Sequence, residues 1–85
     1  MTRKQELNKV KEYINIFFKQ GDCGLFNTRN IVGDSMVPIF KGEYFQLDLC
    51  YNWSYFEVFG TIKEEWEELK KFYNLLEELE KLKED

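Results

Sequence analysis

The segment from Tyr44 to Gly60 constrains the fold more than any other part of this chain. Apolar and polar side chains alternate through Tyr44–Tyr51 and again through Tyr55–Phe59. This period of two is typical of β-strands that have one buried face. Only three residues separate the two runs, so they are expected to pair as an antiparallel hairpin.

Matching apolar side chains across this hairpin selects one register. Leu49 then lies opposite Phe56 and Leu47 lies opposite Val58, which points both pairs toward the core. A slip of one residue would turn every one of these side chains to the opposite face. The remaining side chains of both strands share the second face, which is expected to be at least partly open to water.

Two carboxylates meet on that second face. The register places Asp48 directly opposite Glu57, and like charges in this arrangement destabilise a sheet unless a cation lies between them. One interpretation is a partner-binding spot that accepts an arginine or a lysine. The alternative is neutralisation by Arg29 or Lys41 of the same chain, or by water. The aromatic residues expected near the pair are Tyr44, Tyr55 and Phe59, with Trp53 at the tip of the hairpin.

The run Met36–Phe40 is expected to supply a further strand. Pro38 cannot donate a hydrogen bond to a neighbouring strand, which places this run at an edge or at a bulge. A three-residue loop at Lys41–Glu43 gives the best apolar matching with the next strand. The pairs expected from that loop are Ile39 with Phe45 and Val37 with Leu47. A short additional edge strand over Asn30–Val32 is an alternative.

Amphipathic helices are predicted on both sides of the strands. Thr2 with Gln5, and Thr61 with Glu64, have the capping-box spacing of a helix N-terminus. The second helix is expected to run to about Lys83 and to overhang the shorter strands. The apolar stripes are Leu7, Val10, Ile14 and Phe17 in the first helix, and Ile62, Trp66, Leu69, Tyr73 and Leu76 in the second.

These elements predict an α+β fold in the order α-β-β-β-α. The antiparallel sheet has three strands, or four if the short edge strand forms, and both helices pack on one face. A chain of 85 residues is expected to form a single domain over residues 1–85.

The composition disfavours an enzyme. The chain has no histidine, which removes the commonest general base near neutral pH and the commonest zinc ligand. Cys23 and Cys50 form no Cys-x-x-Cys pair, and no nucleophile–base pair is recognisable. We therefore expect no catalytic residues, no cofactor and no metal.

The net charge of −4 is unevenly distributed. Residues 1–20 carry a net +3, residues 21–60 a net −3 and residues 61–85 a net −4. This pattern disfavours direct binding of nucleic acid and favours a partner protein with a basic surface. The opening residues are polar, unlike a signal peptide, and no apolar run approaches the roughly 20 residues that span a bilayer. A cytoplasmic protein without membrane contact is expected.

The second helix carries two further candidate surfaces. Its acidic residues could mimic the phosphate spacing of a nucleic acid toward a partner, or simply form a solvated face. Its last leucines could pack against a second copy of the chain, or form a solvated tail. The candidate partner-binding residues are Glu64, Glu65 and Glu68, and the candidate dimerisation residues are Leu75, Leu79 and Leu82.

Three short motifs carry a resemblance. They are Gly33-Asp34-x-Met36, Asp48-Leu-Cys-Tyr-x-Trp53 and Tyr55-Phe-Glu-Val-Phe-Gly60 followed by an acidic helix. Over roughly residues 30–75 the chain resembles small uncharacterised proteins that are encoded by phages and integrative elements of low-GC Gram-positive bacteria. The resemblance implies an accessory protein that acts in a host bacterial cell, and it assigns no site residues.

The function implied is inhibition of a host defence nuclease complex, because small phage proteins often bind host defence enzymes and anti-CRISPR proteins are the best-populated class. Such an inhibitor would be a non-enzymatic protein that binds a basic, nucleic-acid-binding surface, for example on a CRISPR effector. The alternative is a homodimeric structural or regulatory adaptor.

Overall fold

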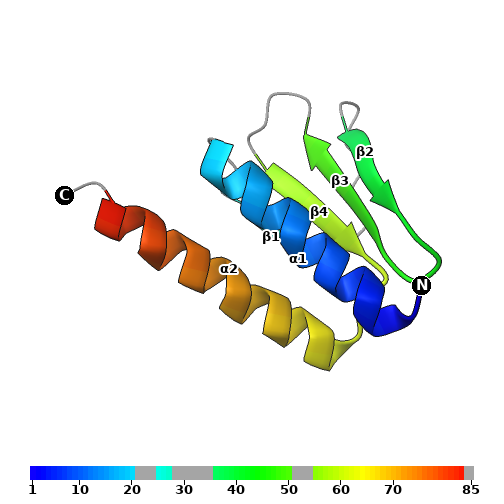
Figure 1. Ribbon diagram of the computed structural model, residues 1–85. Coiled ribbons are helices and arrows are strands. Elements are labelled where there is room, and N and C mark those ends of the chain that lie inside the picture. Colours follow the sequence, from blue (N-terminus) through cyan, green and yellow to red (C-terminus); the bar gives the residue numbers. More distant parts are fainter. Residues whose placement is uncertain (21–24, 28–35, 51–54, 84–85) are drawn as a thin grey trace.

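The computed structural model describes residues 1–20, 25–27, 36–50 and 55–83. Two helices lie side by side across one face of a β-sheet, and α2 extends beyond the end of α1 (Figure 1). The predicted α+β fold, with a helix at each end and an antiparallel three-stranded sheet between them, is confirmed. The elements are α1 (Arg3–Gln20), β1 (Leu25–Asn27), β2 (Met36–Lys41), β3 (Gln46–Cys50), β4 (Tyr55–Phe59) and α2 (Lys63–Lys83).

The sheet contains a fourth strand that the sequence placed elsewhere. Its strand order is β1-β4-β3-β2, and β1 pairs with β4 in parallel while the other pairs are antiparallel. The alternative edge strand at 30–32 lies outside the described residues. The strand at Leu25–Asn27 has only three residues, too few to show a periodic pattern, so its pairing depends on a partner about 30 residues later in the chain.

The register between β3 and β4 agrees with the prediction. Leu47 lies opposite Val58, and Leu49 lies opposite Phe56. All four side chains are almost completely buried beneath the helices. Matching apolar side chains was sufficient to predict this register because one face of the hairpin is buried. A slip of one residue would turn the apolar side chains of that face toward the other side.

The predicted register between β2 and β3 is wrong. Val37 lies opposite Leu49 and Phe40 opposite Leu47, with an irregularity between Pro38 and Phe40. Pro38 lacks an N–H group, so a bulge at this point sacrifices no hydrogen bond that Pro38 could have donated. The connection is also longer than predicted, because Lys41 pairs with Gln46.

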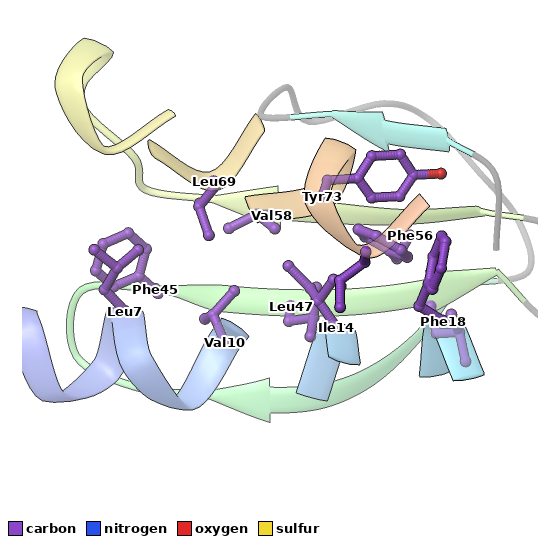
Figure 2. Packing of buried hydrophobic residues seen from close by; sticks show 12 residues of the cluster. Leu7, Val10, Ile14, Phe18, Phe45, Leu47, Phe56, Val58, Leu69 and Tyr73 are labelled. Carbon is purple, nitrogen blue, oxygen red and sulfur yellow. The ribbon is translucent and has the colours of Figure 1, made fainter. Parts of the chain in front are cut away.

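The core fills the space between the helices and the sheet (Figure 2). Tyr73 of α2 makes edge-to-face contacts with Phe18 of α1 and with Phe56 of β4, both with ring centroids 5.7 Å apart. Such edge-to-face contacts contribute stability beyond that gained from burying apolar area. The buried core residues are Leu7, Val10, Ile14, Phe18, Phe45, Leu47, Leu49, Phe56, Val58, Leu69, Tyr73 and Leu76.

The two predicted capping boxes have different outcomes. At α1 the Thr2 N–H donates to Gln5 Oε1 at 2.8 Å, and the Gln5 N–H donates to Thr2 Oγ1 at 3.2 Å, so this capping box is confirmed. At the second helix the prediction is wrong. Thr61 Oγ1 is buried and accepts no hydrogen bond within the described part of the chain, and α2 begins only at Lys63.

Glu6 is a buried carboxylate that holds the β2–β3 turn against α1. Its side chain is 2% exposed. Oε2 accepts a hydrogen bond from the Glu43 N–H at 3.0 Å, and Oε1 accepts from the N–H groups of Tyr44 at 2.8 Å and Phe45 at 3.0 Å. These three donors lie in the turn and have no strand partner, so the carboxylate replaces the water that would otherwise solvate them.

Gly42 allows this approach because it has no side chain. A Cβ atom on Gly42 would lie 2.1 Å from Glu6 Oε1 and 2.5 Å from Glu6 Cδ. The Gly42 N–H also donates to the Phe45 carbonyl across the turn at 2.7 Å. The carboxylate is held by three hydrogen bonds, so it cannot move aside without losing them.

We expect Gly42→Ala to destabilise the protein by about 1–3 kcal/mol, as overpacking does in well-ordered sites. Urea unfolding of the variant measures this loss. Asn8→Ala, on the exposed side of α1, is the control and should change the free energy of unfolding little. Equal stability of Gly42→Ala and the wild type would contradict the close approach of Glu6.

Glu6 also predicts how stability depends on pH. Burial alone would raise the pKa of Glu6, but hydrogen bonds from the backbone N–H groups of Tyr44, Phe45 and Glu43, together with the charged N-terminus, lower it from 4.5. A lowered folded-state pKa gives stability that is complete above the unfolded-state pKa and is lost as pH falls through the folded-state value. We expect the Glu6→Gln variant to be less stable than the wild type at pH 7. The difference in unfolding free energy between the two proteins should narrow below pH 4.5.

Chemical denaturation of both proteins between neutral and acidic pH measures this narrowing. A constant difference in unfolding free energy at every pH would show that the charge of Glu6 is not what binds the turn.

Candidate functional site

The two opposed carboxylates are buried. Asp48 lies opposite Glu57 as predicted. Asp48 is only 8% exposed and Glu57 is fully buried, so the expectation of a water-open face is wrong for this pair. The Gln46 side chain donates a hydrogen bond to Asp48 Oδ1 at 2.9 Å. Little of Asp48 and nothing of Glu57 is therefore exposed to a partner in this structure.

The aromatic residues predicted beside this pair are divided between two places. Tyr55 and Phe59 are half-buried on the same face of β4 as Glu57, whereas Tyr44 lies in the β2–β3 turn and is 40% exposed. Trp53 lies outside the described residues. Burial raises the pKa of the Tyr55 phenol, and negative charge on Cys50 and Glu57 and a hydrogen bond to Cys50 raise it further. Tyr55 therefore stays protonated.

Arg3 contacts both the start of α2 and the β2–β3 turn. Its Nε lies 2.5 Å from Glu65 Oε1, and its Nη2 donates to the Gly60 carbonyl at 2.8 Å. Its guanidinium also lies over the rings of Tyr44 and Phe45, 5.6 Å and 5.1 Å from their centroids. Sequence reasoning missed Arg3, because a single basic residue gives no sign of contacts with residues about 40 to 60 positions away.

Gly60 makes this junction possible. It has a φ of +88°, and a Cβ atom there would lie 2.1 Å from the Tyr44 carbonyl oxygen. Only glycine adopts this conformation readily, so the chain can leave β4, pass close to the turn and enter α2. The junction fixes the first turn of α2 beside Tyr44.

The first half of α2 presents an acidic outward face. Glu64, Glu67 and Glu68 are spaced by three and four residues, so they share one side of the helix, and all three are exposed. Glu68 forms an ion pair with Lys11 and keeps 56% of its side-chain area exposed. Glu65 differs, because it is turned toward Arg3 and is only 13% exposed. We call Glu64, Glu67 and Glu68 the acidic face.

A cleft of about 300 Å³ lies beside the acidic face, between the first turns of α1 and α2. Leu7 contributes an apolar wall, and Arg3 and Glu65 contribute the charged groups that pair with each other. A side chain with an apolar stem and a polar end fits such a cleft. The remaining lining residues are Lys4, Asn8 and Glu68.

The candidate dimerisation residues lie at the other end of α2. Leu75, Leu79 and Leu82 are 52%, 47% and 71% exposed. They are thus accessible, as the sequence predicted for an overhanging helix end. Neither the acidic face nor these three leucines lie at the buried Asp48/Glu57 pair.

Comparisons with known proteins do not identify a relative. No protein-family model, curated protein or solved structure matches the chain. Among the described residues no group of three or more Cys, Asp or Glu side chains could hold a metal ion. Over the same residues, neither helix combines the length and the apolar character that crossing a membrane requires.

The burial of Glu57 predicts the outcome of a charge reversal. We expect Glu57→Lys to lose more than about 2 kcal/mol of unfolding free energy, because a cation would replace an anion at a fully buried position. Glu77→Lys, at an exposed position of α2 away from the helix N-terminus, is the matched control and should change stability by less than about 0.5 kcal/mol. Thermal and urea unfolding compare the two, and equal effects would contradict the buried placement of Glu57.

Proposed function

We propose that this protein is a small, non-enzymatic binding module whose acidic face docks on a basic surface of a partner protein. The observation that carries the proposal is the exposure of Glu64, Glu67 and Glu68 on one side of a helix whose first turns are held in place. Acidic side chains near a helix N-terminus also interact favourably with the helix dipole.

The anchoring of α2 supports a preformed binding surface. Arg3 forms an ion pair with Glu65 and donates a hydrogen bond to the Gly60 carbonyl. Lys11 of α1 forms an ion pair with Glu68. Because these contacts orient the start of α2 before any partner arrives, binding requires little ordering of the backbone. Exposed charges of one sign also accelerate encounter with a surface of opposite sign.

The partner class proposed is a host defence nuclease complex, with the protein acting as an anti-CRISPR-type inhibitor in the bacterial cytoplasm. Nuclease complexes expose basic channels for nucleic acid, and an acidic helix that occupies such a channel competes with the phosphate backbone. The resemblance of residues 30–75 to small phage-encoded proteins and the net charge of −4 both favour this class.

A double charge reversal tests the acidic face. We expect Glu64→Lys/Glu67→Lys to weaken binding to the partner nuclease complex by at least about tenfold, which corresponds to about 1.4 kcal/mol, because two attractive contacts become repulsive. Residual cleavage of target DNA by purified CRISPR effectors measures inhibition, and a plasmid-interference assay in cells measures protection.

The control is Glu12→Lys/Glu77→Lys, which makes the same change in net charge at exposed residues outside the acidic face. It should inhibit as the wild type does. If wild-type protein inhibits no effector and binds none, the proposed partner class is wrong. If the control loses inhibition as fully as the test variant, overall charge is responsible and the acidic face is not the binding surface.

A further inference from the structure

The outward side of α2 is acidic in the first half of the helix and apolar in the second half. The acidic face occupies the first half, whereas Leu75, Leu79 and Leu82 continue along the same side in the second half. Their exposures are large for leucines in a small protein, since the other leucines whose burial the structure describes are buried. The second half therefore presents a stripe of apolar area to water.

Phe72 extends this stripe toward the middle of the helix. The ring is half-buried against the core. Phe72, Leu75, Leu79 and Leu82 are spaced by three, four and three residues, which is the a/d spacing of a helix that packs on another helix. We call these four residues the leucine stripe.

The surroundings leave the three leucines of the stripe accessible, while Phe72 packs partly against the core. α2 projects past the end of α1 and past the sheet, so its last turns have no neighbour on the outward side among the described elements (Figure 1). A groove of about 290 Å³ borders the stripe where α1 ends and adds the apolar side chains of Phe18 and Leu76. The other residues that line the groove are Asn15, Lys19, Leu79, Glu80 and Leu82.

We infer that the leucine stripe is a self-association surface that takes the same stripe of a second copy, with the two α2 helices antiparallel. Two copies then form a two-fold dimer in which Leu75 packs against the partner copy's Leu79, and Phe72 against its Leu82. The apolar residues of each copy cover those of the other without leaving a residue of the stripe unmatched.

The charges on α2 determine this arrangement. A parallel, in-register pair would continue into the acidic face and bring Glu64, Glu67 and Glu68 of both copies together, which like-charge repulsion disfavours. An antiparallel pair overlaps only along the leucine stripe and sends the two acidic faces to opposite ends. A basic partner, by contrast, is attracted to the acidic face and gains nothing from the leucines.

The size of the stripe sets the strength of the dimer. Residues 72–82 span about 15 Å of helix at about 1.5 Å per residue. One short stripe covers much less than the roughly 800 Å² per partner of a standard stable interface. The dimer is therefore weak, reversible and dependent on concentration, and it does not depend on whether the acidic face binds a nuclease complex.

Sedimentation equilibrium across a range of protein concentrations tests the inference. The wild type should shift from monomer to dimer as concentration rises. Leu75→Glu and Leu79→Glu should each weaken association at least tenfold, with unchanged circular dichroism because both residues are exposed. Ile62→Glu is the matched control: Ile62 is 51% exposed, lies outside the stripe and should leave the dimer intact.

Cross-linking tests the orientation. In a Cys23→Ser/Cys50→Ser background, a Leu75→Cys chain mixed with a Leu79→Cys chain should form the mixed disulfide faster than Leu79→Cys links to itself. Preferential self-linking at residue 79 would overturn the antiparallel arrangement. A wild-type protein that stays monomeric at all concentrations, or an Ile62→Glu variant that dissociates as the leucine variants do, would overturn the self-association surface.

Discussion

The fold depends on one carboxylate that reaches from a helix to a turn. Glu6 accepts hydrogen bonds from the N–H groups of Glu43, Tyr44 and Phe45, and it does so while almost completely buried. A carboxylate that accepts several N–H donors at once is a strong and directional anchor. It decides how long the β2–β3 connection is, and it explains why Gly42 must lack a side chain.

Arg3, one turn before Glu6 in α1, extends this anchoring to α2. Glu6 holds the turn from one side, and Arg3 covers the rings of Tyr44 and Phe45 while it binds Glu65 and the Gly60 carbonyl. The first two turns of α1 thus join three segments that are distant in the sequence. The orientation of the acidic face follows from this junction, because the start of α2 is tied to it.

The acidic residues of this chain have two different roles that their sequence does not separate. Asp48 and Glu57 alternate with apolar residues in their strands, as solvent-facing residues would, yet both are buried. Glu64 and Glu67 belong to a run of glutamates and are exposed. Burial depends on which segments cover a face of the sheet, and alternation along a strand indicates only which face a residue is on. Of these four acidic residues, the two on α2 are therefore the ones exposed to solvent.

The sequence by itself determined the α+β fold, the Thr2–Gln5 cap and the β3–β4 register, because each follows from periodicity or spacing within a few residues of the chain. Apolar matching failed for β2 and β3, where Pro38 and the turn bound by Glu6 shift the pairing. Only the tertiary structure decided the parallel strand β1, the contacts of Arg3 and Glu6 and the burial of the Asp48/Glu57 pair. Each of these joins or covers segments far apart in the sequence, and local patterns carry no information about such contacts.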